Sequence, residues 1–177
     1  VTLLEIDQKV DSGDIVDQIK VPIHINDNIS DVLKRVTQTY LDLLEKNIRN
    51  IIKREIVTIP QDHSMASYTR KRLQSDNLID WNLSAFEIYN FIRALSKPYP
   101  GAFTFINKTK LIIWKAKLVE NPTEFIGKPG CIFKITPGEG VIINTGGGYI
   151  MLNEVQYENQ EPECASLALN NLNICLG

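Results

Sequence analysis

Hydrophobic residues in the first third of the chain follow two different periods. Apolar side chains dominate residues 1–6 and recur at alternate positions over residues 15–23, a pattern typical of two β-strands. Pro22 should mark an edge or the end of the second strand, because proline cannot donate to a strand ladder. Over residues 29–52 the apolar positions instead recur every three or four residues, after the capping run at residues 26–28. This predicts a long amphipathic helix whose apolar face covers a core.

The second half of the chain changes to a β pattern. A short helix is expected with Asn82 or Ser84 as its cap, where Glu87, three residues after Ser84, would be the capping-box partner, and it should end before Pro98. Strands are predicted at residues 102–106, 111–119, 130–135, 140–144 and 149–155, with turns at residues 107–108, 121–122, 129–130, 137–138 and 146–148. The three glycines at residues 146–148 are interpreted as a hairpin turn, because no phosphate-loop sequence follows them. Five or six short strands at this spacing predict a small barrel or sandwich.

The periodicity weakens over residues 55–76, which indicates a connector between two domains. We place the first domain at residues 1–63 and the second at residues 64–177. Two strands alone are marginal in water, so the first domain should be the carboxy-terminal part of a larger α/β domain.

Composition narrows the function classes. With 44% hydrophobic and 23% charged residues, the chain can bury an ordinary globular core, and its net charge of −2 shows no basic excess for nucleic acid. Cys131, Cys164 and Cys175 lack metal-ligand spacing, so we expect reduced thiols, no metal and a cytoplasmic location. No apolar run reaches the ~20 residues that cross a bilayer, so no membrane partner is expected.

Candidate chemistry lies in the loop between the first two predicted strands. Asp11 and Asp14 stand beside a bend that Gly13 permits, so two carboxylates are held close to a tight backbone turn. On these residues alone, a solvated turn is the simpler interpretation, because turn chemistry explains their composition.

Three stretches together resemble a known family. LLEIDQKVDSGDIVDQIKVPI, residues 3–23, is similar to the end of the catalytic domain of 10-formyltetrahydrofolate-dependent formyltransferases, a strand, a hydrophobic-Asp-small-Gly-Asp loop and a strand. NLIDW at residues 77–81 and IRALSKPYPGAF at residues 92–103 resemble the start of the same family's carboxy-terminal domain. The resemblance implies an α/β fragment, the end of a doubly wound formyltransferase domain, followed by an OB-like open β-barrel domain with a leading helix.

The resemblance also implies roles for single residues. Asp11 falls where the family keeps the carboxylate of an Asn-His-Asp catalytic set, and a carboxylate there can stabilise an imidazolium during amine attack on the formyl carbon. The pterin side of the pocket for the donor, 10-formyltetrahydrofolate, would be lined, largely by backbone groups, by Asp7, Gln8, Lys9, Val10 and Asp11. Neither His24 nor His63 stands in the context of the family's histidine. We therefore expect the Asn and His upstream of Val1, and we expect residues 1–177 alone to be inactive.

The resemblance leaves the formyl acceptor open. PYPGAFT at residues 98–104 looks more like the nucleotide-sugar enzymes than the methionyl-tRNA enzymes. Residues 66–177 hold 11 Lys+Arg against 10 Asp+Glu, whereas a tRNA-binding domain should present a basic face. We favour a nucleotide-linked aminosugar, with methionyl-tRNA as the alternative. Arg70, Arg72 and Arg93 are candidates for diphosphate binding, although Arg93 could equally pair with Asp80 or cap backbone carbonyls.

A non-catalytic module is the alternative from a different class. If the upstream Asn and His are truly absent, the β-rich domain would form a homodimer or bind a nucleotide or oligonucleotide. Phe103, Phe105 and Trp114 are the candidates for base stacking, but their alternation fits a buried core better.

Overall fold

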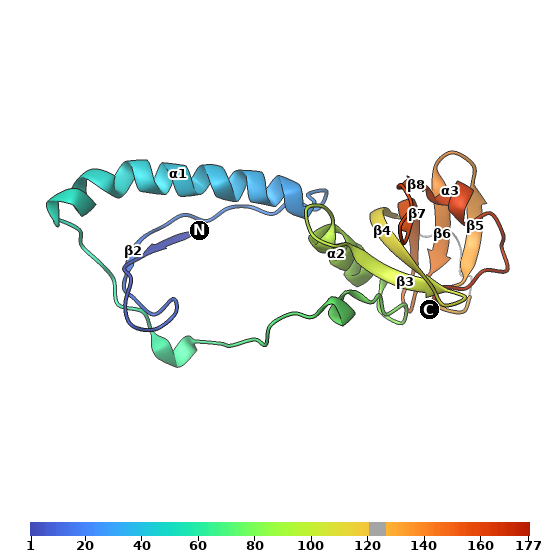
Figure 1. Ribbon diagram of the computed structural model, residues 1–177, viewed down its shortest axis with the longest axis horizontal. Coiled ribbons are helices and arrows are strands. Elements are labelled where there is room, and N and C mark those ends of the chain that lie inside the picture. Colours follow the sequence, from blue (N-terminus) through green and yellow to red (C-terminus); the bar gives the residue numbers. More distant parts are fainter. Residues whose placement is uncertain (121–126) are drawn as a thin grey trace. The chain divides into compact units, whose positions relative to one another are not determined.

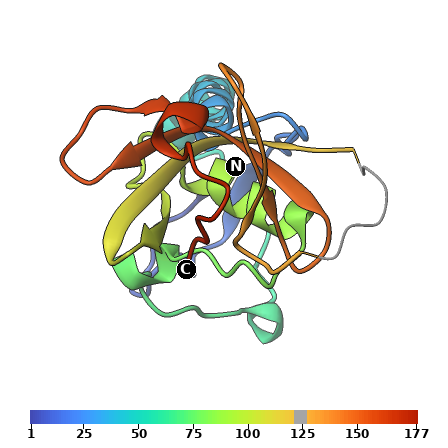
Figure 2. The same cartoon turned by 90° about the vertical axis from the view of Figure 1, so that its right-hand side faces the viewer.

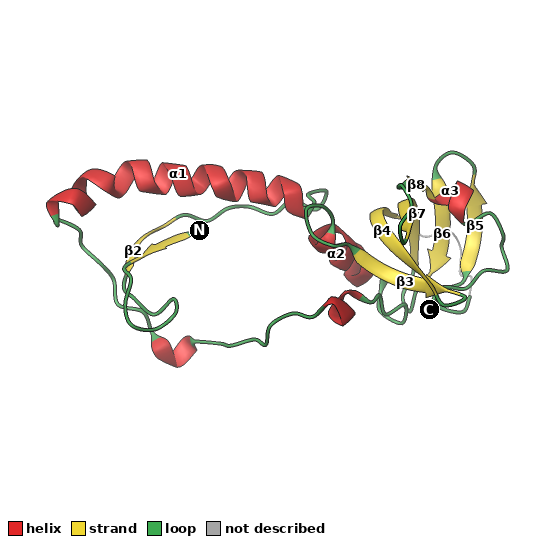
Figure 3. Cartoon of the chain, viewed as in Figure 1, coloured by secondary structure: helices red, strands yellow, loops and turns green. Residues whose placement is uncertain are grey.

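The computed structural model describes residues 1–120 and 127–177, so the turn predicted at residues 121–122 lies outside the described residues. The chain divides into two compact units, Val1–Lys71 and Arg72–Gly177. Unit 1 contains β1 (Thr2–Leu4), β2 (Ile15–Gln18), α1 (Ile29–Lys53) and the 3-10 turn η1 (His63–Met65). Unit 2 contains η2 (Gln74–Asn77), α2 (Ala85–Leu95), β3 (Ala102–Ile106), β4 (Thr109–Leu118), β5 (Ile132–Thr136), β6 (Gly140–Asn144), β7 (Tyr149–Tyr157), β8 (Glu163–Cys164) and α3 (Ala165–Ala168), as Figure 3 shows by colour.

Unit 1 consists of a strand pair and one long helix (Figure 1). Strands β1 and β2 pair antiparallel, with Leu3 opposite Asp17, and β2 ends before Pro22. Helix α1 begins after Asn28, whose side chain accepts the backbone N–H groups of the first turn, and it ends at Arg54 in the left-handed conformation. The two predicted strands and the predicted helix are therefore confirmed.

The apolar face of α1 is only partly covered, contrary to the prediction that it packs on a core along its length. Leu43 is the buried residue of the helix, at 1% exposure. Large apolar side chains exposed along the helix are Tyr40, Leu41, Leu44, Ile48 and Ile52. The physical reason is the small area that two short strands offer to a helix of 25 residues.

Unit 2 is an antiparallel sheet with helix α2 packed on it. The strand order is β3-β4-β7-β6-β5, and β8 adds to β7. Figure 2 shows the strands crossing one another in a strongly curved sheet. The predicted capping box at the start of α2 is confirmed, because Ser84 and Glu87 satisfy each other's backbone N–H groups. The core cluster runs from Ile79 to Leu176 and includes Ile88 and Ile92 of α2.

The chain's final residues connect the two edges of this sheet. Strands β3 and β5 end the pairing order, so each has one edge that no named strand covers. The backbone N–H of Leu176 donates to Gly130 beside β5 at 2.9 Å, and that of Gly177 donates to Phe105 in β3 at 3.0 Å. Among the described residues, the sheet is thus bridged by the terminal segment and is not closed by pairing of β3 with β5.

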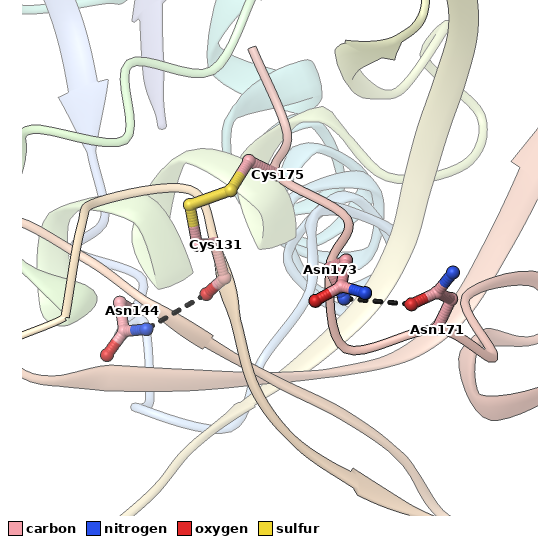
Figure 4. Close-up of a disulfide and its surroundings, with 5 residues drawn as sticks. All are labelled: Cys131, Asn144, Asn171, Asn173 and Cys175. Atoms are coloured by element: carbon pink, nitrogen blue, oxygen red, sulfur yellow. Dashed lines mark hydrogen bonds between the residues drawn. A yellow bond between two sulfur atoms is a disulfide. The ribbon is translucent and has the colours of Figure 1, made fainter.

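A disulfide holds this terminal segment, which corrects the expectation of reduced cysteines. Cys131 and Cys175 are bonded, with their Cα atoms 3.9 Å apart (Figure 4). Cys164 is the free thiol. The backbone brings the two residues together as an antiparallel bridge, and Asn144 Nδ2 donates to the carbonyl of Cys131 at 3.0 Å. The spacing of the cysteines did not predict this disulfide, because the bonded residues lie 44 positions apart and meet only when the terminal segment folds back.

The helices in the described part of the chain include none that is long and apolar enough to cross a membrane.

Candidate functional site

The loop between β1 and β2 is a tight bend that depends on Gly13. This residue is buried, and a Cβ added to it would lie 1.9 Å from the carbonyl oxygen of Glu5. The N–H of Glu5 donates to the carbonyl of Asp14 at 2.9 Å, which closes the base of the loop. The chain can therefore pass this point only with a residue that has no side chain.

The loop residues singled out from the sequence lie at the surface. They are the exposed residues Asp7, Gln8, Lys9, Val10 and Asp11. The backbone N–H of Lys9 donates to the Asp7 carboxylate at 2.7 Å. This bond lowers the pKa of Asp7 below its usual value. Asp7 thus orders the loop as an ionised acceptor.

The two carboxylates of the bend have different surroundings. Asp14 accepts a hydrogen bond from the Thr58 hydroxyl at 3.3 Å and is partly buried. Asp11 is exposed, and its backbone has a positive φ of 55°, which is uncommon for a residue other than glycine. Asp14 is therefore tied to the rest of unit 1, whereas Asp11 presents its carboxylate at the surface.

Gln61, in the connector after α1, contacts this loop, although Gln61 is not among the site residues predicted from the sequence. Its Nε2 donates to the backbone carbonyls of Asp11 at 2.9 Å and Gly13 at 2.6 Å. The contact spans 50 and 48 positions of sequence, so no local pattern could have indicated it.

The candidate arginines belong to both units and make local contacts. Arg70 is an exposed residue of unit 1. In unit 2, Arg72 donates to the Asn77 side chain at 3.0 Å, and its guanidinium lies 5.4 Å from the centre of the Phe91 ring. Arg93 donates to Asn90 Oδ1 at 2.8 Å within α2. Arg72 and Arg93 therefore both have structural partners.

The candidate stacking aromatics differ in burial: Phe103 is buried, as the core interpretation expects, Trp114 is half-buried, and Phe105 is exposed. Alternate residues of β3, including Ala102 and Ile106, enter the core cluster, and Phe103 and Phe105 occupy the opposite face of the strand. Phe103 is nevertheless 8% exposed, with the Lys110 ammonium 4.6 Å from its ring centre, while Phe105 is 37% exposed. This face carries aromatic rings and cations together.

Within residues 1–120 and 127–177, no group of three His, Cys, Asp or Glu side chains is arranged to hold a metal ion.

Comparison with known proteins places the similarity over both units. The family model described as "Formyl transferase, C-terminal domain" matches residues 72–173, which begin where unit 2 begins. The chain is 39% identical over 137 residues to the bifunctional polymyxin resistance protein ArnA of Wigglesworthia glossinidia brevipalpis, covering 77% of this chain and 20% of that protein. It is 35% identical to the methionyl-tRNA formyltransferase of Syntrophus aciditrophicus, covering 91% of this chain and 50% of that enzyme.

A solved structure agrees with these matches. The N-formyltransferase from Helicobacter canadensis, in complex with folinic acid and dTDP-3-aminofucose, superposes with a TM-score of 0.64 at 32% identity. The match covers 88% of this chain and 54% of that one. The present chain therefore spans about half the length, or less, of these relatives.

Proposed function

The chain belongs to the formyltransferase family through its carboxy-terminal domain, and from this membership we propose that it takes part in transferring a formyl group to the amino group of a nucleotide-linked aminosugar. The donor in this proposal is 10-formyltetrahydrofolate. The observation that carries the proposal is the Asp11 loop, an exposed carboxylate on a bend held by Gly13 and Gln61, to which we assign the role of the family's catalytic aspartate.

The role proposed for Asp11 follows from its surroundings. Its carboxylate is exposed, so a histidine or an amine can approach it, while the backbone beneath it is fixed. An ionised carboxylate at such a point stabilises a neighbouring imidazolium and orients the attacking amine. The catalytic Asn and His expected upstream of Val1 belong to the same proposal.

The proposed folate contacts are the backbone groups of Asp7 to Asp11. The loop suits this task because it is exposed and lies outside helix and strand, so its peptide groups are accessible to a pterin ring. The Asp7 carboxylate and Gln61 keep the loop ordered without covering it. When bound, the folate supplies the formyl carbon, and the chain's own groups bind and orient it.

The aminosugar is preferred as acceptor on two observations. The Helicobacter canadensis relative is complexed with dTDP-3-aminofucose, and residues 66–177 carry nearly balanced charge. Methionyl-tRNA remains the second candidate, favoured by the match to methionyl-tRNA formyltransferases over nine-tenths of this chain. We include Arg70, Arg72 and Arg93 in the proposal as ligands of the diphosphate. To bind it, these side chains would give up some of their present contacts.

The acceptor is tested on the full-length gene product with 10-formyltetrahydrofolate. We expect transfer to dTDP-linked aminosugars and none to methionyl-tRNA. Asp11→Asn should reduce turnover at least ~100-fold, because it removes the charge that stabilises the imidazolium. Transfer to tRNA alone would overturn the preferred acceptor, and an unchanged rate for Asp11→Asn would overturn the role of Asp11. Residues 1–177 alone should transfer no formyl group.

The fold proposed for unit 2 is an OB-like barrel in which the terminal segment bridges the open side. The hydrogen bonds of this segment to Gly130 and Phe105 support it.

The assembly and the location are proposed as well. A homodimer is the proposed assembly, to be measured by light scattering. A cytoplasmic location is tested by the redox state of Cys131 and Cys175 in cell extract, since cytoplasmic disulfides are rare.

A further inference from the structure

We propose that Gln61 is a positioning residue that holds the Asp11 loop in its active geometry, an inference that rests on the proposed function. Its amide nitrogen donates to two carbonyl oxygens of the loop, at 2.9 Å to Asp11 and 2.6 Å to Gly13. These carbonyls lie on either side of Ser12, so one side chain fixes the backbone on both sides of the bend. Asp11 is thereby held through its main chain, and its carboxylate stays available.

The chemistry of the contact requires an amide. A glutamine Nε2 carries two N–H donors, one for each carbonyl. A glutamate of the same size has no donor when ionised and would face two carbonyl oxygens with a negative charge. The contact therefore requires the side-chain amide, and a side chain of the same size without N–H donors cannot replace it.

The rest of the connector is fastened to the same loop. Ile59 pairs with Ile15, at the start of β2, through two backbone hydrogen bonds of 2.8 and 2.9 Å. Thr58 donates to the Asp14 carboxylate at 3.3 Å. The backbone just before Gln61 is thus hydrogen-bonded to the end of the loop, and this fixes the position from which the Gln61 side chain extends.

The backbone at Asp11 explains why such a clamp is needed. Its φ of 55° lies in the left-handed region, which residues other than glycine adopt only infrequently. The surrounding structure must supply contacts that keep this conformation. The bond from Gln61 to the Asp11 carbonyl acts directly on the strained residue.

The test uses the full-length protein with Gln61→Ala and Gln61→Glu, and with Gln38→Ala as the matched control. Gln38 lies on α1 in the same unit and donates to Asp42 at 2.9 Å, away from the loop. Amide hydrogen exchange over residues 7–14, binding of folinic acid, and formyl transfer at saturating substrates are measured for each variant, with the melting temperature as a check on folding.

We expect both Gln61 variants to exchange about ten-fold faster over residues 7–14, because opening of the bend no longer breaks two hydrogen bonds. Turnover should fall ~10- to 100-fold, since small misplacements of a reacting group are costly. Folinic acid should bind more weakly, and Gln61→Glu should be the more severe variant. Gln38→Ala should match the wild type in all three readouts.

Each other outcome decides against part of the inference. Unchanged exchange over residues 7–14 would show that Gln61 does not hold the loop. Faster exchange with wild-type turnover would show that the loop is held but that Gln61 positions nothing for the reaction. If the wild type itself transfers no formyl group while the loop is protected by Gln61, the proposed function fails and the contact is structural, which also ends the positioning role.

Discussion

At the scale of single residues, Asp17 joins the strand pair of unit 1 to its long helix. The Lys46 ammonium lies 2.8 Å from Asp17 Oδ2, and the Asn47 amide donates to the same oxygen at 2.8 Å. The bonds from Lys46 and Asn47, with the backbone N–H of Gln18, lower the pKa of Asp17 to about 2. Because this pKa is depressed, the stabilisation is complete above pH ~4 and is lost as the pH falls through about 2.

Lys46→Ala should raise the pKa of Asp17 toward 3.8, because it removes the largest of these contributions. The measurement is a carboxyl titration by NMR. Lys53→Ala is the control, since Lys53 lies on the same helix but pairs with Glu55. An Asp17 midpoint that stays near 2 in Lys46→Ala would contradict the prediction.

The glycine turn of unit 2 offers a second prediction, on two neighbouring residues. The predicted hairpin turn is confirmed, since Thr145 donates to the carbonyl of Gly148 at 3.1 Å between β6 and β7. A Cβ on Gly146 would lie 1.7 Å from the carbonyl oxygen of Asn82, whereas one on Gly147 would meet Ser84 at an ordinary 3.4 Å.

Gly146→Ala should destabilise unit 2 by at least ~2 kcal/mol, because backbone must move to admit the methyl group. Gly147→Ala should cost less than ~1 kcal/mol, since its methyl group fits. Denaturant unfolding of both variants measures the difference. Equal losses of stability would contradict the geometry at Gly146.

At the scale of elements, the periodicity of apolar residues predicted the helices and strands that depend on local sequence. The capping box of α2, the long helix α1 and the strands of unit 2 were foreseen, because spacing of apolar residues and caps determines them. The two-residue strand β8 and the short helix α3 were missed, since they are too short to show a period. The Gln61 contact and the terminal bridge join residues far apart in sequence. Such contacts form only when the chain folds, so no local sequence pattern predicts them.

The disulfide should be the main stabiliser of the terminal segment. It closes a loop of 44 positions, for which the loss of unfolded-state entropy amounts to about 4 kcal/mol. Cys131→Ser with Cys175→Ser should therefore lower the melting temperature of unit 2 substantially, and adding a reductant to the wild type should have a similar effect. Cys164→Ser is the control, because Cys164 is a free thiol whose sulfur lies 3.2 Å from the Ser166 hydroxyl. A melting temperature insensitive to reductant would contradict the prediction.

At the scale of the whole molecule, the two units differ in how they bury apolar surface. Unit 2 has its own core, because every member of the buried cluster lies between Ile79 and Leu176. Unit 1 buries Leu43 and leaves much of α1 exposed. Large exposed apolar faces mark surfaces for a partner or for further chain. This difference agrees with the family match, which covers unit 2 from Arg72 to residue 173.

Limited trypsin digestion should separate unit 2 from the rest of the chain. Residues 66–71 are exposed and lie outside helix and strand, and they include Arg70 and Lys71, so the protease can bind this segment in extended form. Lysines within β4, such as Lys115, are in a paired strand and should resist cleavage. A fragment beginning at Lys71 or Arg72 should therefore accumulate.

The control for this cut is the double variant Arg70→Gln with Lys71→Gln, which should delay release of the fragment. The fragment should also melt at the same temperature as unit 2 in the uncut protein, because its core and its disulfide both lie within residues 72–177. Degradation of unit 2 as fast as unit 1 would mean that its fold depends on unit 1. In that case the carboxy-terminal domain would be a part of one cooperative protein, and the acceptor specificity proposed for it could not be studied on the domain alone.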